Sequence, residues 1–291
     1  MSGEAFALLA AVAFALGAVL SRRFMEGPNP VLPEAGVFVS MLTDAVVFTP
    51  LTLWEVGRGA LQHLTPASFA LFLVGGVSGT VVGRNLAYLS VQRIGPSRST
   101  AVRLVNVVFS TFLGLIALRE LPRPLQITGA ALITAGLWWV LSEPNPSSTH
   151  GIDPWGVVAA AGAAFAFALG DTLRRRALGF TPFPFLGASI GAWVALVAQV
   201  AWFTARGLRV RGVRIAWHVD VVASALANTA AILLLFLALQ RTAVANAAVL
   251  YNLQVLLVIL LSRRVLRERI GLRLVAGSLV CLLGTAAVLF G

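Results

Sequence analysis

The sequence contains no lysine, so all 22 of its basic residues are arginine. Without lysine, a Walker A phosphate loop and a Schiff-base nucleophile are both excluded. Its single cysteine, Cys281, cannot form an internal disulfide. Three histidines, His63, His150 and His218, stand far apart and show no metal-ligand spacing. Because no catalytic triad or carboxylate pair falls on one helix face, we expect no enzyme, no metal and no cofactor.

Charge is also scarce in this chain. Only 11% of its 291 residues are charged, about half the share of a soluble domain, and 58% are hydrophobic. The mean hydropathy is +0.89, which indicates a multi-pass protein of a cell (inner) membrane. The net charge of +11 comes from arginines that lie mostly in short loops between apolar segments. We therefore expect membrane lipid, and not nucleic acid, as the partner of this charge.

Long apolar segments follow one another along the whole chain. A spanning helix needs about 20 mostly apolar residues. Ten segments meet this requirement, at residues 4–24, 34–54, 67–90, 97–118, 122–141, 155–177, 182–204, 219–240, 243–262 and 271–290. The sequence thus predicts an all-α membrane protein with ten crossings.

The second half of the sequence repeats the first half. Ala13–Gly17 returns as Ala166–Gly170, and Tyr88–Leu141 overlays Phe236–Leu289 without a gap. Each copy holds five crossings, and an odd number forces the second copy to enter the bilayer inverted. Inverted repeats around a midplane site are typical of secondary transporters. We predict three parts, a first repeat at 1–141, a polar linker at 142–153 and a second repeat at 154–291.

Four charged residues, Asp44, Arg84, Arg103 and Asp171, stand out inside the predicted segments, because charge near the bilayer centre is costly. At 1.5 Å per residue, Arg84 and Arg103 lie about 9 Å below one membrane face and Asp44 about 15 Å below it, so the three side chains can meet. Asp44 is then either the counter-ion of an arginine or a group that titrates or contacts ligand. Asp171 lies near the other face and is followed by Arg174, which favours a structural ion pair.

Polar residues follow the helical repeat on the third and fourth segments. Ser99, Arg103, Asn106 and Ser110 are spaced to share one stripe, and the repeat places Tyr251 and Gln254 opposite the two central positions. The candidate solute-binding residues are Arg84, Tyr88, Arg103, Asn106, Tyr251, Gln254, Asn228 and Thr80. Two alternatives stay open, because arginines can extend to the head groups and amides can serve as interhelical hydrogen-bond partners.

The charge of this cluster points to the kind of ligand. Two arginines with one aspartate leave an excess of positive charge. Guanidinium groups bind carboxylates and phosphates bidentately. The hypothesis is therefore a small-molecule substrate with an anionic group.

One further motif occurs once in each repeat. Arg119-Glu120 and Arg267-Glu268 each close a fourth helix and precede a glycine-rich fifth helix. This junction resembles that of the drug/metabolite transporter superfamily, in its ten-helix EamA-type branch, although leucine replaces the glycine that the family has before the pair. The resemblance implies a basket of helices around a central cavity, with the fifth and tenth helices at the periphery, and transport of small metabolites.

These observations favour an exporter of amino acids or related carboxylates that works by alternating access. Two alternatives are a translocator of an anionic lipid or lipid-linked phosphate, and a non-transporting scaffold or receptor. Arginines are more frequent in the loops opposite the termini, which predicts termini outside, whereas the resemblance implies cytoplasmic termini. Proton coupling through Asp44 and the oligomeric state stay open.

Overall fold

The computed structural model describes residues 2–27, 29–118, 123–142, 153–205, 218–239, 241–242 and 249–291. All regular elements in this part of the chain are helices. They are α1 (Gly3–Glu26), α2 (Pro33–Val56), the 3₁₀ turn η1 (Ala60–His63), α3 (Pro66–Gly75), the π-helix η2 (Gly76–Gly83), α4 (Arg84–Ile94), α5 (Pro96–Arg103), α6 (Asn106–Leu118), α7 (Pro124–Ser142), α8 (Pro154–Leu178), α9 (Pro184–Ala205), α10 (Val219–Leu239), a short stretch at 249–252, α12 (Gln254–Val265) and α13 (Leu272–Phe290).

Local sequence explains where several helices begin. Proline stands in the first turn of α2, α3, α5 and α8, where its missing N–H leaves no bond unmade. Thr65 and Ser68 form a reciprocal capping box at the start of α3. Asp153 accepts a hydrogen bond from the backbone N–H of Trp155 at the start of α8.

The helices confirm the predicted membrane-spanning, all-helical fold. Eight of the described helices, with α3, η2 and α4 taken as one run of Pro66–Ile94, are long and apolar enough to cross a membrane. The remaining two predicted segments correspond to α5 with α6, and to residues 249–265. The predicted Arg119-Glu120 pair and residues 143–152 of the predicted linker lie outside the described residues.

These two segments each contain a local 3₁₀-type turn, at residues 104–105 and at Leu253, which the apolar length of the segments does not predict. A turn at residues 104–105 separates α5 from α6, and Leu253 separates 249–252 from α12. At both places the backbone N–H bonds three residues back, as from Leu104 to Ala101 and from Leu253 to Leu250. Residues 105 and 253 occupy the same position in the two repeats, so the interruption is a shared feature.

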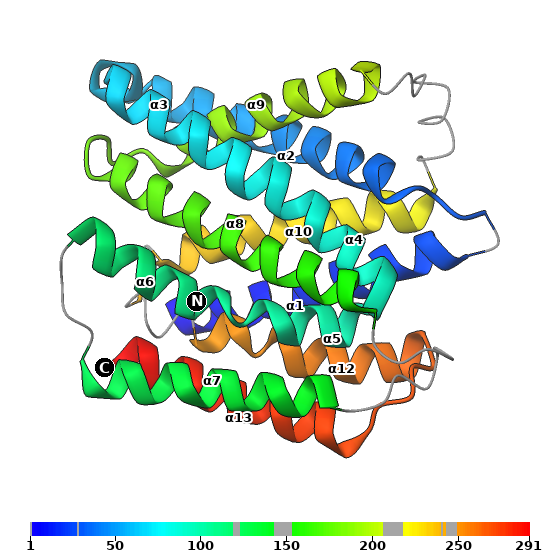
Figure 1. The fold of residues 1–291 in the computed structure, drawn as a ribbon. Coiled ribbons are helices and arrows are strands. Elements are labelled where there is room, and N and C mark those ends of the chain that lie inside the picture. Colours follow the sequence, from blue (N-terminus) through cyan, green and yellow to red (C-terminus); the bar gives the residue numbers. More distant parts are fainter. Residues whose placement is uncertain are drawn as a thin grey trace.

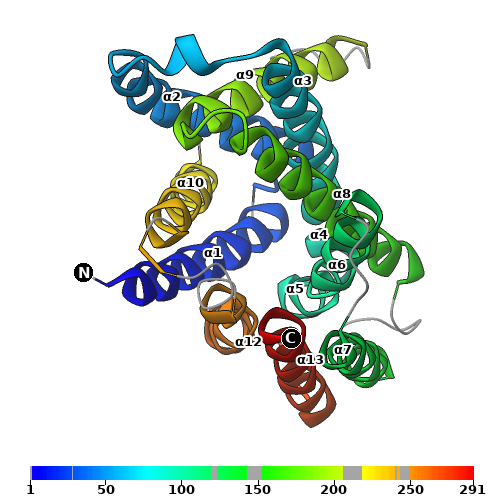
Figure 2. The ribbon, with the colours of Figure 1, turned by 90° about the vertical axis from the view of Figure 1, so that its left-hand side faces the viewer.

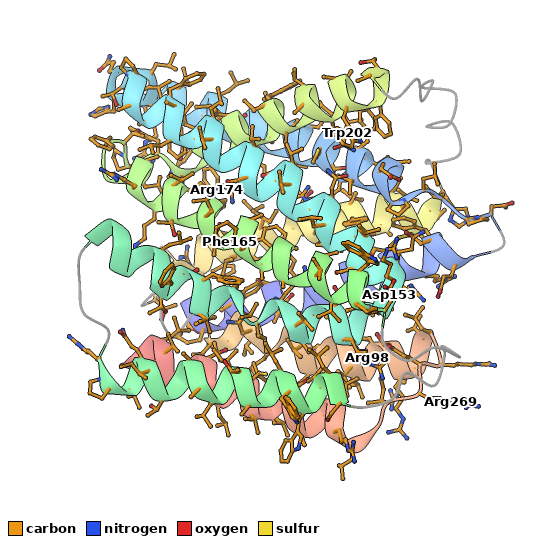
Figure 3. The ribbon with its side chains drawn as sticks, viewed as in Figure 1. Arg98, Asp153, Phe165, Arg174, Trp202 and Arg269 are labelled. Carbon is orange, nitrogen blue, oxygen red and sulfur yellow. The ribbon has the colours of Figure 1, made fainter. Side chains whose placement is uncertain are left out.

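Both termini lie at the same end of the helix bundle (Figure 1). We call this end the terminal face and the opposite end the distal face. Figure 3 shows Arg174 toward the terminal face, and Asp153, Arg98 and Arg269 toward the distal face. Seen along the bundle, α7 and α13 lie side by side at its edge, as the resemblance implies for the fifth and tenth helices (Figure 2).

Glycines bring α7 and α13 into close contact. A Cβ atom added at Gly136 would lie 2.6 Å from the carbonyl oxygen of Gly277, and one added at Gly277 would lie 2.6 Å from that of Gly136. Gly129 and Gly284 oppose each other in the same reciprocal way at 2.6 Å. Backbones approach this closely only where both helices lack side chains. These glycines overlay one another in the two repeats, so the seam joins the repeats symmetrically.

Candidate functional site

Asp44 and Arg84 form an ion pair inside the bundle. Arg84 Nη1 lies 2.6 Å from Asp44 Oδ2, and only 3% of the Asp44 side chain and 13% of the Arg84 side chain are exposed. Arg84 Nη1 also donates to Ser40 Oγ at 3.0 Å. The hydroxyl of Thr229 on α10 donates to the other oxygen, Asp44 Oδ1, at 2.5 Å. Asp44 is therefore the counter-ion of Arg84 in this conformation, and its carboxylate joins α2, α4 and α10.

A second ion pair neutralises Asp171. Its Oδ1 lies 3.1 Å from Arg174 Nη1, one turn further along α8. Arg174 Nη2 donates to Thr80 Oγ1 at 2.8 Å. Thr80 lies in the π-helix, where the helical period is wider than 3.6 residues, and it is directed to Arg174 while Arg84 turns to Asp44. The structure therefore does not bring Thr80 together with Arg84, although regular spacing predicts one shared face.

Arg103 differs from both of these arginines. It is the last residue of α5, just before the interruption, and its side chain is partly buried. Its Nη2 donates to Thr100 Oγ1 at 3.1 Å, and its buried Nε has no hydrogen-bond partner in the structure. Among the described residues, no carboxylate lies within ion-pair distance of its guanidinium. Such an unbalanced buried charge needs an explanation.

Both tyrosines of the chain lie near Arg103. Tyr88 and Tyr251 are each within electrostatic range of its guanidinium. The hydroxyl of Tyr88 interacts with Ser40 and Ser224. Tyr251 interacts with Gln254, and its ring packs edge-on against Phe14 with 5.2 Å between the ring centroids. Tyr251, which the repeat places opposite Arg103, therefore lies in the same part of the bundle as Arg103.

The two local turns are flanked by polar residues that occupy equivalent positions in the two repeats. Arg103 and Asn106 stand on either side of the turn at 104–105, and Tyr251 and Gln254 stand on either side of Leu253. The Oδ1 atom of Asn106, like the Nε atom of Arg103, is buried and has no hydrogen-bond partner in the structure. One unpaired donor and one unpaired acceptor therefore lie at the same turn. At both places the backbone stays helical and only tightens by one turn of i→i−3 bonding, so what the two halves share is a local irregularity beside polar residues.

Asn228 has a different environment from these residues. Its Nδ2 donates to the carbonyl oxygen of Ser224 at 2.8 Å. A Cβ atom added at Gly17 of α1 would lie 2.5 Å from that same nitrogen. Asn228 thus packs against α1, but its hydrogen bond runs within α10 and not to another helix.

Some functional contacts were not predicted from the sequence. Thr229, which binds Asp44, has no polar mate in the first repeat that could have identified it. Gln199 of α9 is 1% exposed and accepts from Asn85 Nδ2 at 3.0 Å. A lone polar residue in an apolar helix gives the only sequence signal for such a bond, and it does not name the partner.

The distal face carries its own set of ionic contacts. Arg93 at the end of α4 lies 2.8 Å from Asp153, and this hydrogen bond holds the pKa of Asp153 below its usual range. Glu268 accepts from Ser97 Oγ at 2.8 Å, and burial raises its pKa despite the nearby charges of Arg98 and Arg22. Arg267 has φ of 55°, and this left-handed turn folds Glu268 back toward the end of α12. The Arg-Glu junction of the second repeat thus fastens α12 to α5.

A metal site does not emerge from this part of the molecule. The described residues contain no group of three or more His, Cys, Asp or Glu side chains close enough to bind an ion. The central polar groups are an arginine, amides and phenols, which are donors and neutral acceptors. Such a set suits an organic anion.

Comparison with known proteins agrees with these features. The profile of the EamA-like transporter family matches residues 1–142 and 154–290. A chloroplastic WAT1-related protein of Arabidopsis thaliana is 23% identical over 139 residues, which is 48% of this chain and 33% of that protein. The match thus spans about a third of the length of this curated relative.

A solved crystal structure shows the same fold. It covers 98% of this chain and 95% of its own, with a TM-score of 0.59 and 15% sequence identity. At that identity the likeness establishes architecture only. Together with the family profile over both halves, it leads to one conclusion: the chain belongs to the EamA-like transporter family, within the drug/metabolite transporter superfamily, and is a multi-pass membrane protein of a family that transports small solutes.

Proposed function

We propose that this chain is a secondary transporter of small organic anions or zwitterions, with amino acids and related carboxylates as the first candidates, and that it exports them by alternating access. The observation that carries the proposal is the guanidinium of Arg103, which bonds to Thr100 but has no carboxylate partner among the described residues and a buried Nε without a partner. The pairs Asp44–Arg84 and Asp171–Arg174 each sum to zero, so Arg103 leaves one positive charge in the centre of the bundle.

A carboxylate or phosphate supplies what this arrangement lacks. A guanidinium binds such a group through two parallel N–H···O bonds, and charge-assisted bonds of this kind are about twice as strong as neutral ones. Asn106 adds an unpaired acceptor for an ammonium or hydroxyl group of the same solute. Tyr88 and Tyr251 add phenol hydroxyl groups that can donate hydrogen bonds to the same solute.

The scaffold alternative predicts a neutral interior. The Asp44–Arg84 pair meets this condition for one arginine, but Arg103 does not, because it has no carboxylate partner among the described residues. A purely structural protein gains nothing from an unbalanced charge at this depth. A transporter does, since its solute balances the charge during each cycle.

The test is counterflow in proteoliposomes that contain the purified protein. Vesicles are preloaded with amino acids, other carboxylates, phosphates or cations, and uptake of the labelled solute is followed. We expect exchange of acidic or zwitterionic solutes. Arg103→Ala should weaken it about 10- to 100-fold, the effect of losing one charge-assisted interaction, and Arg103→Lys should fall between.

The matched control is Arg263→Ala, which removes an exposed arginine at the end of α12 and should leave exchange unchanged. Exchange of anionic solutes that persists undiminished in Arg103→Ala would overturn the proposed site. Exchange of no water-soluble solute, together with movement of a labelled anionic lipid between leaflets, would instead support the lipid alternative.

A further inference from the structure

The two repeats are related by sequence but do not make the same contacts at the two faces. In an inverted-repeat transporter, the two faces exchange contacts during the cycle. A contact present at one face and absent at the other therefore identifies which face is closed. This inference rests on the proposed transport function.

At the distal face, Arg22 of α1 binds the end of α4. Its Nη1 donates to the carbonyl oxygen of Val91 at 2.8 Å and also to that of Gln92, and the side chain forms an ion pair with Glu26. Only 16% of the Arg22 side chain is exposed. The Val91 carbonyl also accepts from the N–H of Gly95, whereas residue 96 is a proline and offers no N–H to the Gln92 carbonyl. The end of a helix also carries partial negative charge, so a guanidinium is well matched to these carbonyls.

At the terminal face, the corresponding arginine makes no such contact. The repeat places Arg175 of α8 opposite Arg22, and Leu239, the last residue of α10, opposite Val91. Arg175 is exposed and makes no hydrogen bond or ion pair in the structure as described. Nearby on α8, the Asp171 side chain is 64% exposed. The terminal end of α8 is therefore open, whereas the distal end of α1 is held.

Other contacts show which helices keep together. α1 packs along α10, and Arg23 lies 3.1 Å from Asp220 across this interface. α8 packs along α3, η2 and α4 in the same manner, with Arg93 bound to Asp153. The helix pair α1 with α10 and the helix pair α8 with α3–α4 occupy equivalent positions in the two repeats. They therefore define two bodies, α1 with α10 and α3–α4 with α8. Arg22 crosses from the first body to the second at the distal face, and the Asp44 carboxylate connects α4 with α10 at the centre.

We propose that Arg22 and Arg175 are alternating latches: Arg22 caps the end of α4 and closes the distal face in the conformation seen here, and Arg175 caps the end of α10 and closes the terminal face in the opposite conformation. Each latch connects the same two bodies. Release of one allows the bodies to rock until the other engages. The central site at Arg103 is thereby exposed to one face at a time.

The experiment measures distances between spin labels in detergent-solubilised protein that carries Cys281→Ala. One label pair, at Asn29 and Gln92, reports on the distal face, and a second pair, at Phe180 and Arg241, reports on the terminal face. No solute is needed. Arg22→Ala should raise the ratio of distal-open to distal-closed molecules about tenfold or more, the effect of losing a charge-assisted hydrogen bond, so the Asn29–Gln92 distance lengthens and the Phe180–Arg241 distance shortens.

Two further variants make the test specific. Arg23→Ala removes the neighbouring arginine and its ion pair, but this pair lies within one body, so both distance distributions should match the parent. In the double variant Arg22→Ala, Arg175→Ala, the short Phe180–Arg241 component should be smaller than in Arg22→Ala alone, because neither face then has its latch.

The proposal is overturned if Arg22→Ala leaves both distributions unchanged, or if Arg23→Ala shifts them equally. Because the distances are read without solute, the result is separate from transport. A protein that exchanges no solute but shows these shifts would refute the transport proposal and support the latches. Active solute exchange in a protein whose label distances do not change would support the transport proposal and refute the latches.

Discussion

At the scale of single residues, the pair Asp44–Arg84 and the lone Arg103 have opposite roles. Arg84 is neutralised by a carboxylate that also accepts from Thr229. Arg103 has a threonine as its hydrogen-bond partner and an unpaired Nε. Removal of one member of a buried ion pair typically costs about 3–5 kcal/mol, because the other charge is left unbalanced. The two arginines should therefore respond differently to substitution.

We expect Asp44→Asn to lower the free energy of unfolding by about 3–5 kcal/mol. Arg84→Met should also lower it, and the double variant should recover most of the loss. Thermal unfolding in detergent measures these effects as a double-mutant cycle. The double variant should retain Arg103-dependent exchange if Arg84 serves only as the partner of Asp44. Loss of exchange equal to that of Arg103→Ala would show that Arg84 contacts solute.

The double variant Asp44→Asn, Arg84→Met also tests proton coupling. If Asp44 releases and binds a proton in each cycle, exchange driven by a pH gradient should disappear in the folded double variant while exchange without a gradient remains. A transport rate with the same pH dependence as the parent would exclude Asp44 as the coupling group.

At the scale of helices, hydropathy predicts where each segment lies but not the irregularities within it. The predicted segments and the observed helices agree within a few residues, as for 34–54 and α2 (Pro33–Val56). The interruption at residues 104–105 escaped prediction because neither glycine nor proline stands there. The π-helix Gly76–Gly83 also escaped it, and the altered period turned Thr80 toward Arg174. The polar residues that flank both interruptions were the only sequence signal.

The seam between α7 and α13 gives a prediction about helix packing. In Gly136→Ala, the new Cβ would lie 2.5 Å from the sulfur of Cys281 and 2.6 Å from the carbonyl oxygen of Gly277. Because a backbone atom cannot move aside without shifting the helix, we expect a loss of about 1–3 kcal/mol in unfolding free energy. Gly57→Ala is the control, since its nearest atom would be 3.5 Å away. Equal melting temperatures for the two variants would contradict the seam.

At the scale of the whole molecule, the crossings place both termini on one face. We expect single cysteines introduced at Ser2 and Gly291, in a Cys281→Ala background, to react alike with a membrane-impermeant maleimide in sealed vesicles. A cysteine at Asn29, on the distal face, should show the opposite protection. Equal labelling of Ser2 and Asn29 would contradict this topology. The direction of protection also decides between the arginine count and the family expectation for the side of the termini.

The division into repeats at 1–141 and 154–291 stays a prediction at this scale, as does export rather than uptake. The latches at Arg22 and Arg175 depend on the relation between the repeats, which the sequence displays. Which of the two arginines contacts a helix end depends on the relative tilt of the two helix bodies. No sequence pattern indicates that tilt.

The sequence by itself determined that the chain spans a membrane with about ten helices, that its halves resemble each other, and that the arginines of the polar stripes, Arg84 and Arg103, lie in the first half. These properties follow from local composition, because the thickness of the bilayer sets segment length and the apolar solvent penalises charge residue by residue. Only the tertiary structure decided that Asp44 neutralises Arg84, that Arg103 has no carboxylate partner among the described residues and that Arg22 contacts the end of α4. Pairing at a distance depends on helix rotation and on crossing angles, and these are fixed by the packing of all helices together rather than by any one segment.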